Sequence, residues 1–474
     1  MQPHSAARIE VISPMTEAVL GHAPDGNRQD MDRAVAAARE AFDNGPWPRM
    51  TLAERKAVLQ RLSEQFKANA EVLAELVTTE MGCPITLSRT MQAAAPRVLI
   101  DTYLELADQY PFRAVRRTPL GNALVTRAPV GVVAAVVPWN GPMLVTMLKL
   151  SPALLAGCTV VLKPAPETPF DAYLLGEMAQ AAGVPAGVIN IVPAGRESSE
   201  YLVTHPGVDK VSFTGSSAAG RRIASLCGQD LRRVSLELGG KSAAVLLDDA
   251  DFDKAVEYLR IGSFRNTGQV CSTKTRIVVS ENKAAELIDR LVALVETMPV
   301  GDPMDPATQF GPLVSQRQRD RVQDYIGIGL AEGARLVRGG PGYPPGLDKG
   351  WFVNPTIFAD VDRKMRIAQE EIFGPVLSIL TYRTEEEAVS IANDSDYGLN
   401  GAVFTDDIER GLKIANRIET GTIELNGNLT GFHAPMGGWK TSGIGREGGL
   451  EGFEAYVETR SIGISKELAD ELAA

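Results

Sequence analysis

Short apolar segments that alternate with helical patterns from residue 130 onward constrain the fold of this chain more than any other feature. The segment VGVVAAVVP at 130–138 is rich in β-branched residues and is bounded by Gly and Pro, which is typical of a buried parallel strand. Helical patterns at 143–157 and 170–183 follow, interleaved with the strand-like segments CTVVLKP, VINIVP and VDKVSFTG. Strands that alternate with helices predict a doubly wound, Rossmann-like α/β sheet.

A second alternating series begins after Gly240. Its strand-like segments are KSAAVLLDD, TRIVVS, FVNPTIF, PVLSILTY, GAVFT and GTIELN. They predict a second α/β domain. Ahead of both series, residues 28–44 and 51–81 carry apolar residues at helical spacing.

Two further segments belong to neither series. Residues 113–129 have the pattern of a polar hairpin, and FEAYVETRSIGI near the C-terminus has the pattern of a strand. A hairpin and a lone strand expose backbone edges that need a partner in the same chain or in a neighbouring one. We therefore expect a homo-oligomer, either a dimer or a tetramer.

Composition excludes several classes of function. The 474 residues suffice for two or three domains, and the formal net charge of −11 argues against binding to nucleic acids or anionic membranes. The N-terminus lacks the pattern of a secretory signal, and no apolar stretch reaches the roughly 20 uninterrupted residues of a membrane span. The four cysteines are too widely spaced for a disulfide framework, which favours the cytoplasm.

Cys271 is the candidate nucleophile of this chain. It follows the small polar loop NTGQV rather than a hydrophobic stripe, whereas the other three cysteines are expected in the core. A thiol attacks an electrophilic carbon as the thiolate, so the site must supply a base, an electropositive pocket or both. Glu237, in the segment LELGGK, is the candidate base, because the glycines that follow it allow backbone and ligand to approach closely.

Several motifs fail on their context. GIGREG at 443–448 matches the dinucleotide fingerprint GxGxxG, but it follows no strand and too few residues remain for a βαβ unit, so we interpret it as a tight structural loop. The GKS at 240–242 lacks the earlier glycine of a Walker A loop. The four histidines show no metal spacing and there is no GxSxG elbow, so no metal is expected.

Three residues at strand ends have two interpretations each. Ser216 lies where helix N–H groups could bind a phosphate, or it is a simple N-cap. Lys163 could pair with a ribose or phosphate oxygen, or its stem could be buried with the amine at the surface. Asn140 could hydrogen-bond a developing oxyanion, or form an ordinary Asx turn.

Taken together, these segments resemble the aldehyde dehydrogenase superfamily, specifically its NAD(P)-dependent, non-acylating members. The resemblance extends over nearly the whole chain and rests on SPMTEAVLG, PVGVVAAVVPWN, LLAGCTVVLKPAPETP, FTGSSAAG, LELGGKS, NTGQVC, QEEIFGPVLSI and GGWKTSGIGREGG. It implies a cofactor-binding domain (1–112 and 130–239), a catalytic domain (240–440) and a small β oligomerisation arm (113–129 and 455–474). The N-terminus begins later than the family's usual first strand pair, which leaves the outer edge of the first domain undefined.

The resemblance also implies roles for individual residues. Cys271 would attack the aldehyde carbonyl, and Asn140 with the backbone N–H of Cys271 would form the oxyanion hole of the thiohemiacetal. After hydride transfer to the nicotinamide, Glu237 would activate water to hydrolyse the thioester to a carboxylic acid. The physical logic agrees, because hydride leaves readily from a tetrahedral oxyanion and one positioned water can hydrolyse a thioester.

By the same resemblance, Glu371 would hold the nicotinamide ribose and Lys163 and Ser216 the adenosine ribose and pyrophosphate. The expected cofactor set is completed by Trp139, Gly215, Leu238, Gly239 and Phe373. Many NAD-preferring members carry a glutamate three residues after the equivalent of Lys163, where this chain has Pro166 followed by Glu167. NAD is therefore expected and NADP stays possible, because a missing carboxylate removes repulsion against a 2′-phosphate.

Positions that match the family's substrate tunnel are Gly141, Val145, Leu148, Arg265, Val270, Ser272, Thr430 and His433. Gly141, Thr430 and Met436 stand where bulkier aromatic residues are common, which suggests a roomy entrance and a medium-sized or bulky aldehyde, aromatic or terpenoid. Arg265 could attract an acidic aldehyde, or turn outward into a salt bridge, and the salt bridge is the more ordinary role.

Three other functions compete with this one. An acylating dehydrogenase would pass the acyl group to coenzyme A, but such relatives usually lack the glutamate that corresponds to Glu237. A non-catalytic structural relative would need none of Cys271, Glu237 and Asn140. A plain thioesterase or esterase would not need the cofactor residues.

Overall fold

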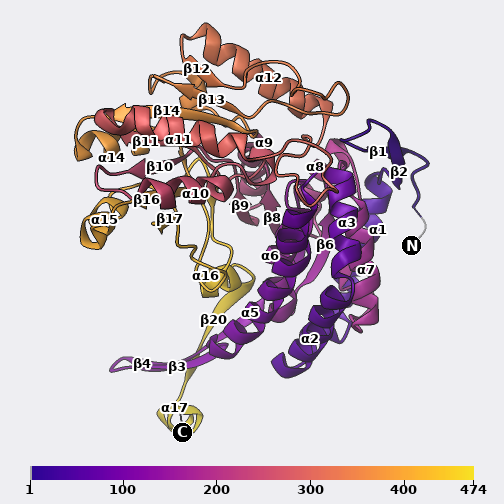
Figure 1. The fold of residues 1–474 in the computed structure, drawn as a ribbon. Coiled ribbons are helices and arrows are strands. Elements are labelled where there is room, and N and C mark those ends of the chain that lie inside the picture. Colours follow the sequence, from indigo (N-terminus) through magenta and orange to yellow (C-terminus); the bar gives the residue numbers. More distant parts are fainter. Residues whose placement is uncertain (1–2, 474) are drawn as a thin grey trace.

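The computed structural model describes residues 3–473 and contains two large sheets with helices on both faces of each (Figure 1). The first sheet has six strands in the order β19-β9-β8-β5-β6-β7 and is parallel except for β19. Its strands are β5 (Val132–Val136), β6 (Thr159–Lys163), β7 (Ile189–Ile191), β8 (Lys210–Thr214), β9 (Arg233–Glu237) and β19 (Gly443–Ile444). The predicted doubly wound α/β fold is confirmed.

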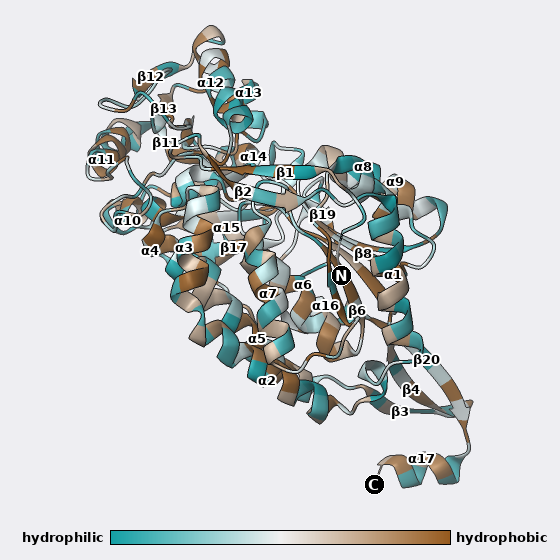
Figure 2. Ribbon diagram, turned by 90° about the vertical axis from the view of Figure 1, so that its right-hand side faces the viewer, coloured by the Kyte–Doolittle hydropathy of each residue, from teal (hydrophilic) through white to brown (hydrophobic). Residues whose placement is uncertain are grey.

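Helices cover both faces of this sheet. One face packs on α1 (Arg28–Asp43), α8 (Arg196–Thr204) and α9 (Ser217–Gln229). The other packs on α2 (Leu52–Ala68), α3 (Ala70–Met81), α5 (Ala95–Gln109), α6 (Pro142–Ala156), α7 (Phe170–Ala181) and α16 (Gly449–Glu454), with α4 (Ile85–Leu87) and a π-turn at Ser88–Ala94 beside them. Figure 2 shows bands of brown and teal along the outer helices, whose apolar residues face the sheet.

The second sheet has seven strands in the order β12-β13-β14-β11-β10-β16-β17. Its strands are β10 (Ser242–Leu246), β11 (Lys274–Ser280), β12 (Arg335–Arg338), β13 (Thr356–Ala359), β14 (Val376–Tyr382), β16 (Asn400–Phe404) and β17 (Thr422–Leu425). Its helices are α10 (Phe252–Gly262), α11 (Ala284–Glu296), α12 (Gln316–Ala331), α13 (Arg366–Gln369), α14 (Glu385–Asn393) and α15 (Ile408–Ala415). Only β12 runs antiparallel to its neighbour.

A three-stranded sheet projects from the body. The hairpin of β3 (Arg113–Thr118) and β4 (Gly121–Pro129) pairs through β4 with β20 (Val457–Ile464), so the two edges that need a partner find one in the same chain. In Figure 1 this sheet extends below the body, and α17 (Lys466–Ala473) lies at its far end with the C-terminus. The sequence pattern did not predict α17.

The N-terminal edge corrects the sequence analysis. Although the chain was expected to begin after the family's first strand pair, β1 (Arg8–Ile12) and β2 (Val19–Pro24) form an antiparallel pair there. The pattern is weak because most of these residues are exposed or half-buried, so the strands lack the alternation that marks a buried strand.

Other elements differ in extent from the predicted ones. The helical pattern at 51–81 is two helices that meet at Asn69. The strand predicted at FVNPTIF forms only after Pro355, because proline cannot donate to a ladder. FEAYVETRSIGI begins inside α16 and becomes a strand at Val457. The short strands β15 (Tyr397–Gly398) and β18 (Trp439–Lys440) pair with each other in an antiparallel, two-stranded sheet. Within residues 3–473, no helix is long and apolar enough to cross a membrane.

Candidate active site

The carboxyl ends of three neighbouring parallel strands bring the predicted residues of the first sheet together. Asn140 follows β5 and precedes α6, Ser216 lies between β8 and α9, and Glu237 is the last residue of β9. In open α/β sheets ligands bind outside the carboxyl ends of the strands. Cys271 comes from the second sheet, three residues ahead of β11, and lines the same cavity as Asn140 and Ser216.

The loop that carries Cys271 has an unusual backbone. Asn266, Thr267 and Gly268 are consecutive residues with φ of +52°, +56° and +75°. Left-handed conformations cost about 1–2 kcal/mol for each residue with a side chain, so the surrounding structure must hold them. A Cβ at Gly268 would lie 2.3 Å from the carbonyl oxygen of Gly374, which explains why a glycine stands there.

Hydrogen bonds hold this loop against the first domain. Asn140 donates its side-chain amide to the carbonyl of Gln269 at 3.0 Å, and Asn266 donates to the carbonyl of Asn140 at 3.2 Å. The Gln269 side chain accepts from the backbone N–H of Val314 at 3.1 Å. The side chain of Asn140 thus reaches the nucleophile loop rather than forming a local Asx turn, and it fixes Cys271 relative to β5.

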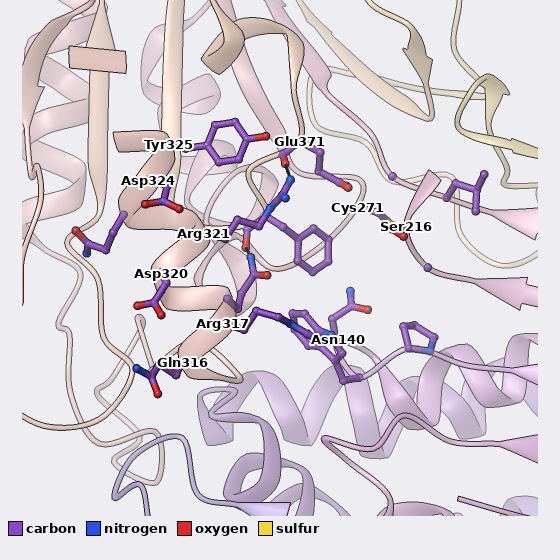
Figure 3. Close-up of a pocket in the computed structure, with 18 of the residues that line it drawn as sticks. Asn140, Ser216, Cys271, Gln316, Arg317, Asp320, Arg321, Asp324, Tyr325 and Glu371 are labelled. Atoms are coloured by element: carbon purple, nitrogen blue, oxygen red, sulfur yellow. Dashed lines mark hydrogen bonds between the residues drawn. The ribbon is translucent and has the colours of Figure 1, made fainter. Parts of the chain in front are cut away.

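A cavity of about 1470 Å³ runs from Cys271 along the carboxyl edge of the first sheet. Figure 3 shows Cys271, Ser216, Asn140 and Glu371 on one side, and residues of α12 on the other. Arg321 of α12 donates to the backbone carbonyl of Glu371.

Glu371 lies where two glycines allow it to approach the strand end. Its carboxylate accepts from the backbone N–H of Gly240 at 3.0 Å, and a Cβ at Gly239 would lie 2.3 Å from its Oε2. Burial raises the pKa of Glu371 to about 7. The other carboxylate oxygen accepts from no donor among residues 3–473 and the side chain lines the cavity, so it can accept from a ligand hydroxyl.

Burial favours the uncharged form of both the candidate nucleophile and the candidate base. Burial, followed by the charges of Glu371 and Glu237, raises the pKa of Cys271 to about 12, and Arg265 opposes this. Burial and the neighbouring Glu447 raise the pKa of Glu237 well above its ordinary value. Neither oxygen of Glu237 has a hydrogen-bond partner within the described residues. Glu237 can therefore act as a base only after its carboxyl has lost its proton.

The sequence matches the Aldehyde dehydrogenase family over residues 1–462. The chain belongs to the aldehyde dehydrogenase family. It is 46% identical to geranial dehydrogenase from Castellaniella defragrans over 97% of this chain and 96% of that protein.

Solved structures of family members superpose closely. An aldehyde dehydrogenase from Mycobacterium tuberculosis in complex with NAD⁺ has a TM-score of 0.96 and 45% identity, with 98% of this chain and 96% of that chain covered. A variant of aldehyde dehydrogenase C from Pseudomonas syringae in complex with NAD⁺ and octanal has a TM-score of 0.95 and 41% identity, with 98% and 94% covered.

Most residues that the family resemblance placed at the cofactor do line the cavity of this family member. They are Trp139, Gly215, Ser216, Leu238, Gly239, Glu371 and Phe373. The Trp139 and Phe373 rings pack edge to face at 5.4 Å. Ser216 also caps α9 by accepting from Ala219 at 3.3 Å, so its two interpretations are compatible. Lys163 is buried at the end of β6 and does not line the cavity. Burial lowers the pKa of its amine to about 8.

The residues matched to the substrate tunnel are more scattered. Val145 lines the cavity, Leu148 and Val270 are buried, Gly141 precedes α6, Thr430 is exposed, and the exposed His433 contacts Glu105 at 3.2 Å. Arg265 donates to Ser272 Oγ at 2.6 Å, and no carboxylate of residues 3–473 forms a salt bridge with it. The outward salt bridge is therefore wrong, because the left-handed loop turns this side chain toward Cys271.

Sequence reasoning missed the charged pair behind Glu237. The amine of Lys149 in α6 is buried and lies 2.6 Å from the carboxylate of Glu447, which is part of the loop at 443–448 that was interpreted as structural. That loop includes β19, which pairs with β9, so it packs directly on Glu237. A lysine inside the apolar helix 143–157 was the available signal, because buried lysines need a partner. Among the described residues, no cluster of His, Cys, Asp or Glu could hold a metal.

Proposed function

We propose that this protein oxidises an aldehyde to a carboxylic acid with NAD⁺ as hydride acceptor. One observation carries the proposal: Cys271 and Asn140 line a cleft of cofactor-type residues, and the carboxyl of Glu237 at the end of β9 lies close enough to the thiol for its charge to raise the thiol pKa. Family membership supports the reaction class. The presence of Glu237 favours hydrolysis over transfer of the acyl group to coenzyme A.

In the first half of the reaction, the Cys271 sulfur bonds to the aldehyde carbon and the carbonyl oxygen becomes an oxyanion. The thiol proton must leave, since burial raises the pKa of Cys271 to about 12, and the cleft that Cys271 lines gives this proton a route to solvent water. Asn140 and the backbone N–H of Cys271 stabilise the oxyanion. A bound nicotinamide supplies the acceptor for the hydride that leaves this carbon.

In the second half, a water attacks the thioester carbon while Glu237 removes the water's proton. The new C–O bond forms, the C–S bond breaks, and the electron pair returns to the Cys271 sulfur. Glu237 then returns the water's proton to the Cys271 sulfur and the acid departs. One proton, the one that left the thiol, therefore goes to solvent in every turnover.

The cofactor-type residues fit a dinucleotide. Glu371 would accept from a ribose hydroxyl, Gly239 and Gly215 leave room for close approach, and the N-terminus of α9 offers N–H groups to the pyrophosphate. Glu167 bonds Arg317 at 3.0 Å and interacts with Lys163, so a carboxylate lies at the adenosine end despite Pro166. NAD⁺ is therefore the preferred form, and NADP⁺ the weaker one, because this carboxylate would repel a 2′-phosphate.

The aldehyde is proposed to be medium-sized or bulky. Two observations support this: Gly141, Thr430 and Met436 are smaller or more flexible than the aromatic residues common at the matching positions of the family, and of the relatives one is named geranial dehydrogenase and another was crystallised with octanal. Arg265, which carries no carboxylate partner, makes an acidic aldehyde the alternative.

Absorbance at 340 nm over a panel of aldehydes, with NAD⁺ and with NADP⁺, tests these points together. We expect kcat/KM for a ten-carbon aldehyde to exceed that for acetaldehyde by at least about tenfold, since each buried methylene contributes about 0.8 kcal/mol. Comparable values would remove the basis for a bulky substrate. If the protein instead prefers a semialdehyde that carries a carboxylate, and Arg265→Met abolishes this preference, the substrate would be assigned to the acidic aldehydes.

We also propose that the arm joins copies of this chain. It extends from the body and carries exposed apolar residues, with Ile462, Leu468 and Leu472 each about two-fifths exposed. Light scattering on the eluted protein is expected to give at least twice the 50.8 kDa of one chain. A single species of monomer mass at micromolar concentration would contradict the assignment.

A further inference from the structure

Arg265 is folded back onto the segment that carries the nucleophile. The residues at 266–268 have left-handed backbone conformations and separate Arg265 from the cysteine loop. Across this turn, the Arg265 guanidinium donates to the hydroxyl of Ser272 at 2.6 Å. Because Ser272 directly follows Cys271 in the chain, this hydrogen bond holds a cation beside the thiol.

The carboxylate of the surrounding side-chain cluster is already occupied by other donors. The charge of Arg265 acts on Tyr258 and Lys274. Both of these side chains bond Glu424, which also accepts from Asn400 at 3.1 Å. Among residues 3–473, no carboxylate forms a salt bridge with Arg265. Two cations and one carboxylate leave the cluster with a positive charge in excess.

The guanidinium is partly withdrawn from water. Arg265 is half-buried, and its Nε is buried without a hydrogen-bond partner within the described residues. Salt and water screen a partly buried charge much less than an exposed one. The charge therefore acts over a longer distance than it would at the surface.

The charges that face Cys271 oppose one another. Burial raises the pKa of the thiol most, and the charges of Glu371 and Glu237 add to this effect. The charge of Arg265 acts in the opposite direction. Cys271 leads into strand β11 rather than into a helix, so its own segment offers no helix N-terminus to a thiolate. The cation that favours the thiolate is therefore Arg265.

We propose that Arg265 is a positioning residue that keeps a cation beside the Cys271 sulfur and thereby increases the share of thiolate that can attack the aldehyde. This inference deepens the proposed function and rests on it. The thiol proton leaves through the cleft to solvent water, and the sulfur keeps the electron pair of the S–H bond. The guanidinium stabilises the negative charge and keeps its own protons, so nothing is oxidised or reduced.

Alkylation of Cys271 tests this inference in the absence of cofactor and aldehyde. The thiolate attacks iodoacetamide, a C–S bond forms and iodide leaves, so the rate depends on the thiolate fraction. Arg265→Met removes the charge, whereas Arg265→Lys keeps it and, like Arg265→Met, loses the planar guanidinium. Mass spectrometry of the Cys271 peptide gives the rate for each protein across the neutral and weakly alkaline pH range.

The rate profile of Arg265→Met is expected to move to higher pH by about half a unit or more, which lowers the rate about threefold at a fixed neutral pH. Loss of a nearby cation raises the pKa of a thiol by about one unit, and the greater nucleophilicity of the more basic thiolate offsets about half of this effect. Arg265→Lys should remain closer to the wild-type profile than to that of Arg265→Met.

Arg260→Met is the matched control. Arg260 is a half-buried arginine of α10 that bonds Glu257 and Gln309 instead of the cysteine segment. Its replacement also removes one positive charge from this domain, but it should leave the alkylation profile of Cys271 unchanged. Circular dichroism checks that every variant is folded.

Iodoacetate separates two roles of Arg265, because this reagent carries a carboxylate and iodoacetamide is neutral. If Arg265→Met slows the reaction with iodoacetate alone, Arg265 binds anions and the inference is overturned. Equal iodoacetamide profiles in folded Arg265→Met and Arg265→Lys would also contradict it. Absence of NADH formation with the wild-type protein would overturn the proposed function and leave the alkylation profiles as they are.

Discussion

Replacement of Cys271 by alanine is expected to lower aldehyde-dependent NADH formation by about 10⁴-fold or more, because no other group can form the covalent intermediate. Cys83, Cys158 and Cys227 are all at least nine-tenths buried, and Cys271 is the one cysteine in residues 3–473 that lines the cavity. Absorbance at 340 nm with saturating NAD⁺ and a ten-carbon aldehyde measures the effect. The variant should still bind NAD⁺, which equilibrium fluorescence can check.

Cys227→Ala is the matched control for this experiment. Cys227 lies in α9, the helix whose N-terminus borders the cleft, but its thiol is buried in the hydrophobic face of the sheet. Its replacement should leave turnover within about twofold, since the change removes one small buried group. Full activity of Cys271→Ala would show that a different group performs the chemistry.

Glu237→Gln is expected to separate the two halves of the reaction. The amide has the shape of the carboxyl but cannot take a proton, so hydrolysis should slow by about 10²–10⁴-fold while one equivalent of NADH still forms rapidly. Rapid-quench or stopped-flow kinetics would show a burst followed by a slow phase, with the acyl group retained on Cys271 by mass spectrometry. Multiple turnovers at the wild-type rate would contradict the role of Glu237.

The pH dependence has a definite sign. Burial and Glu447 raise the pKa of Glu237, so the carboxyl holds its proton on the acid side of that value and becomes a base only as the pH rises through it. Steady-state turnover should therefore increase with pH, and this limb should disappear in Glu237→Gln. A profile that is the same in both proteins would assign the limb to another group.

The residues that we propose for the chemistry could be recognised in the sequence because their local surroundings are unusual. Cys271 follows a polar glycine-containing loop, and Glu237 precedes two glycines. The strands β5, β6 and β10 could be recognised for the opposite reason, since their short, largely apolar runs are typical of a sheet buried on both faces.

Other features could not be read because they depend on distant parts of the chain. Lys149 and Glu447 are separated by almost 300 positions, and neither has a local pattern that reveals the other. From the sequence, we expected Arg265 to form a salt bridge at the surface. In the structure its guanidinium donates a hydrogen bond to the hydroxyl of Ser272, and the left-handed residues Asn266 and Thr267 follow it directly. The strand pair β1–β2 has too little burial to leave a periodic signal.

By itself, the sequence determined the α/β class and indicated a candidate nucleophile and a candidate base, because the residues around Cys271 and Glu237 are unusual for a protein core. Only the tertiary structure decided which groups surround Cys271 and Glu237, and hence that the pKa of each is raised. It also decided that β20 closes on β4 and in which register β8 pairs with β9. Desolvation and strand register are properties of packed neighbours, and no single segment of the chain contains them.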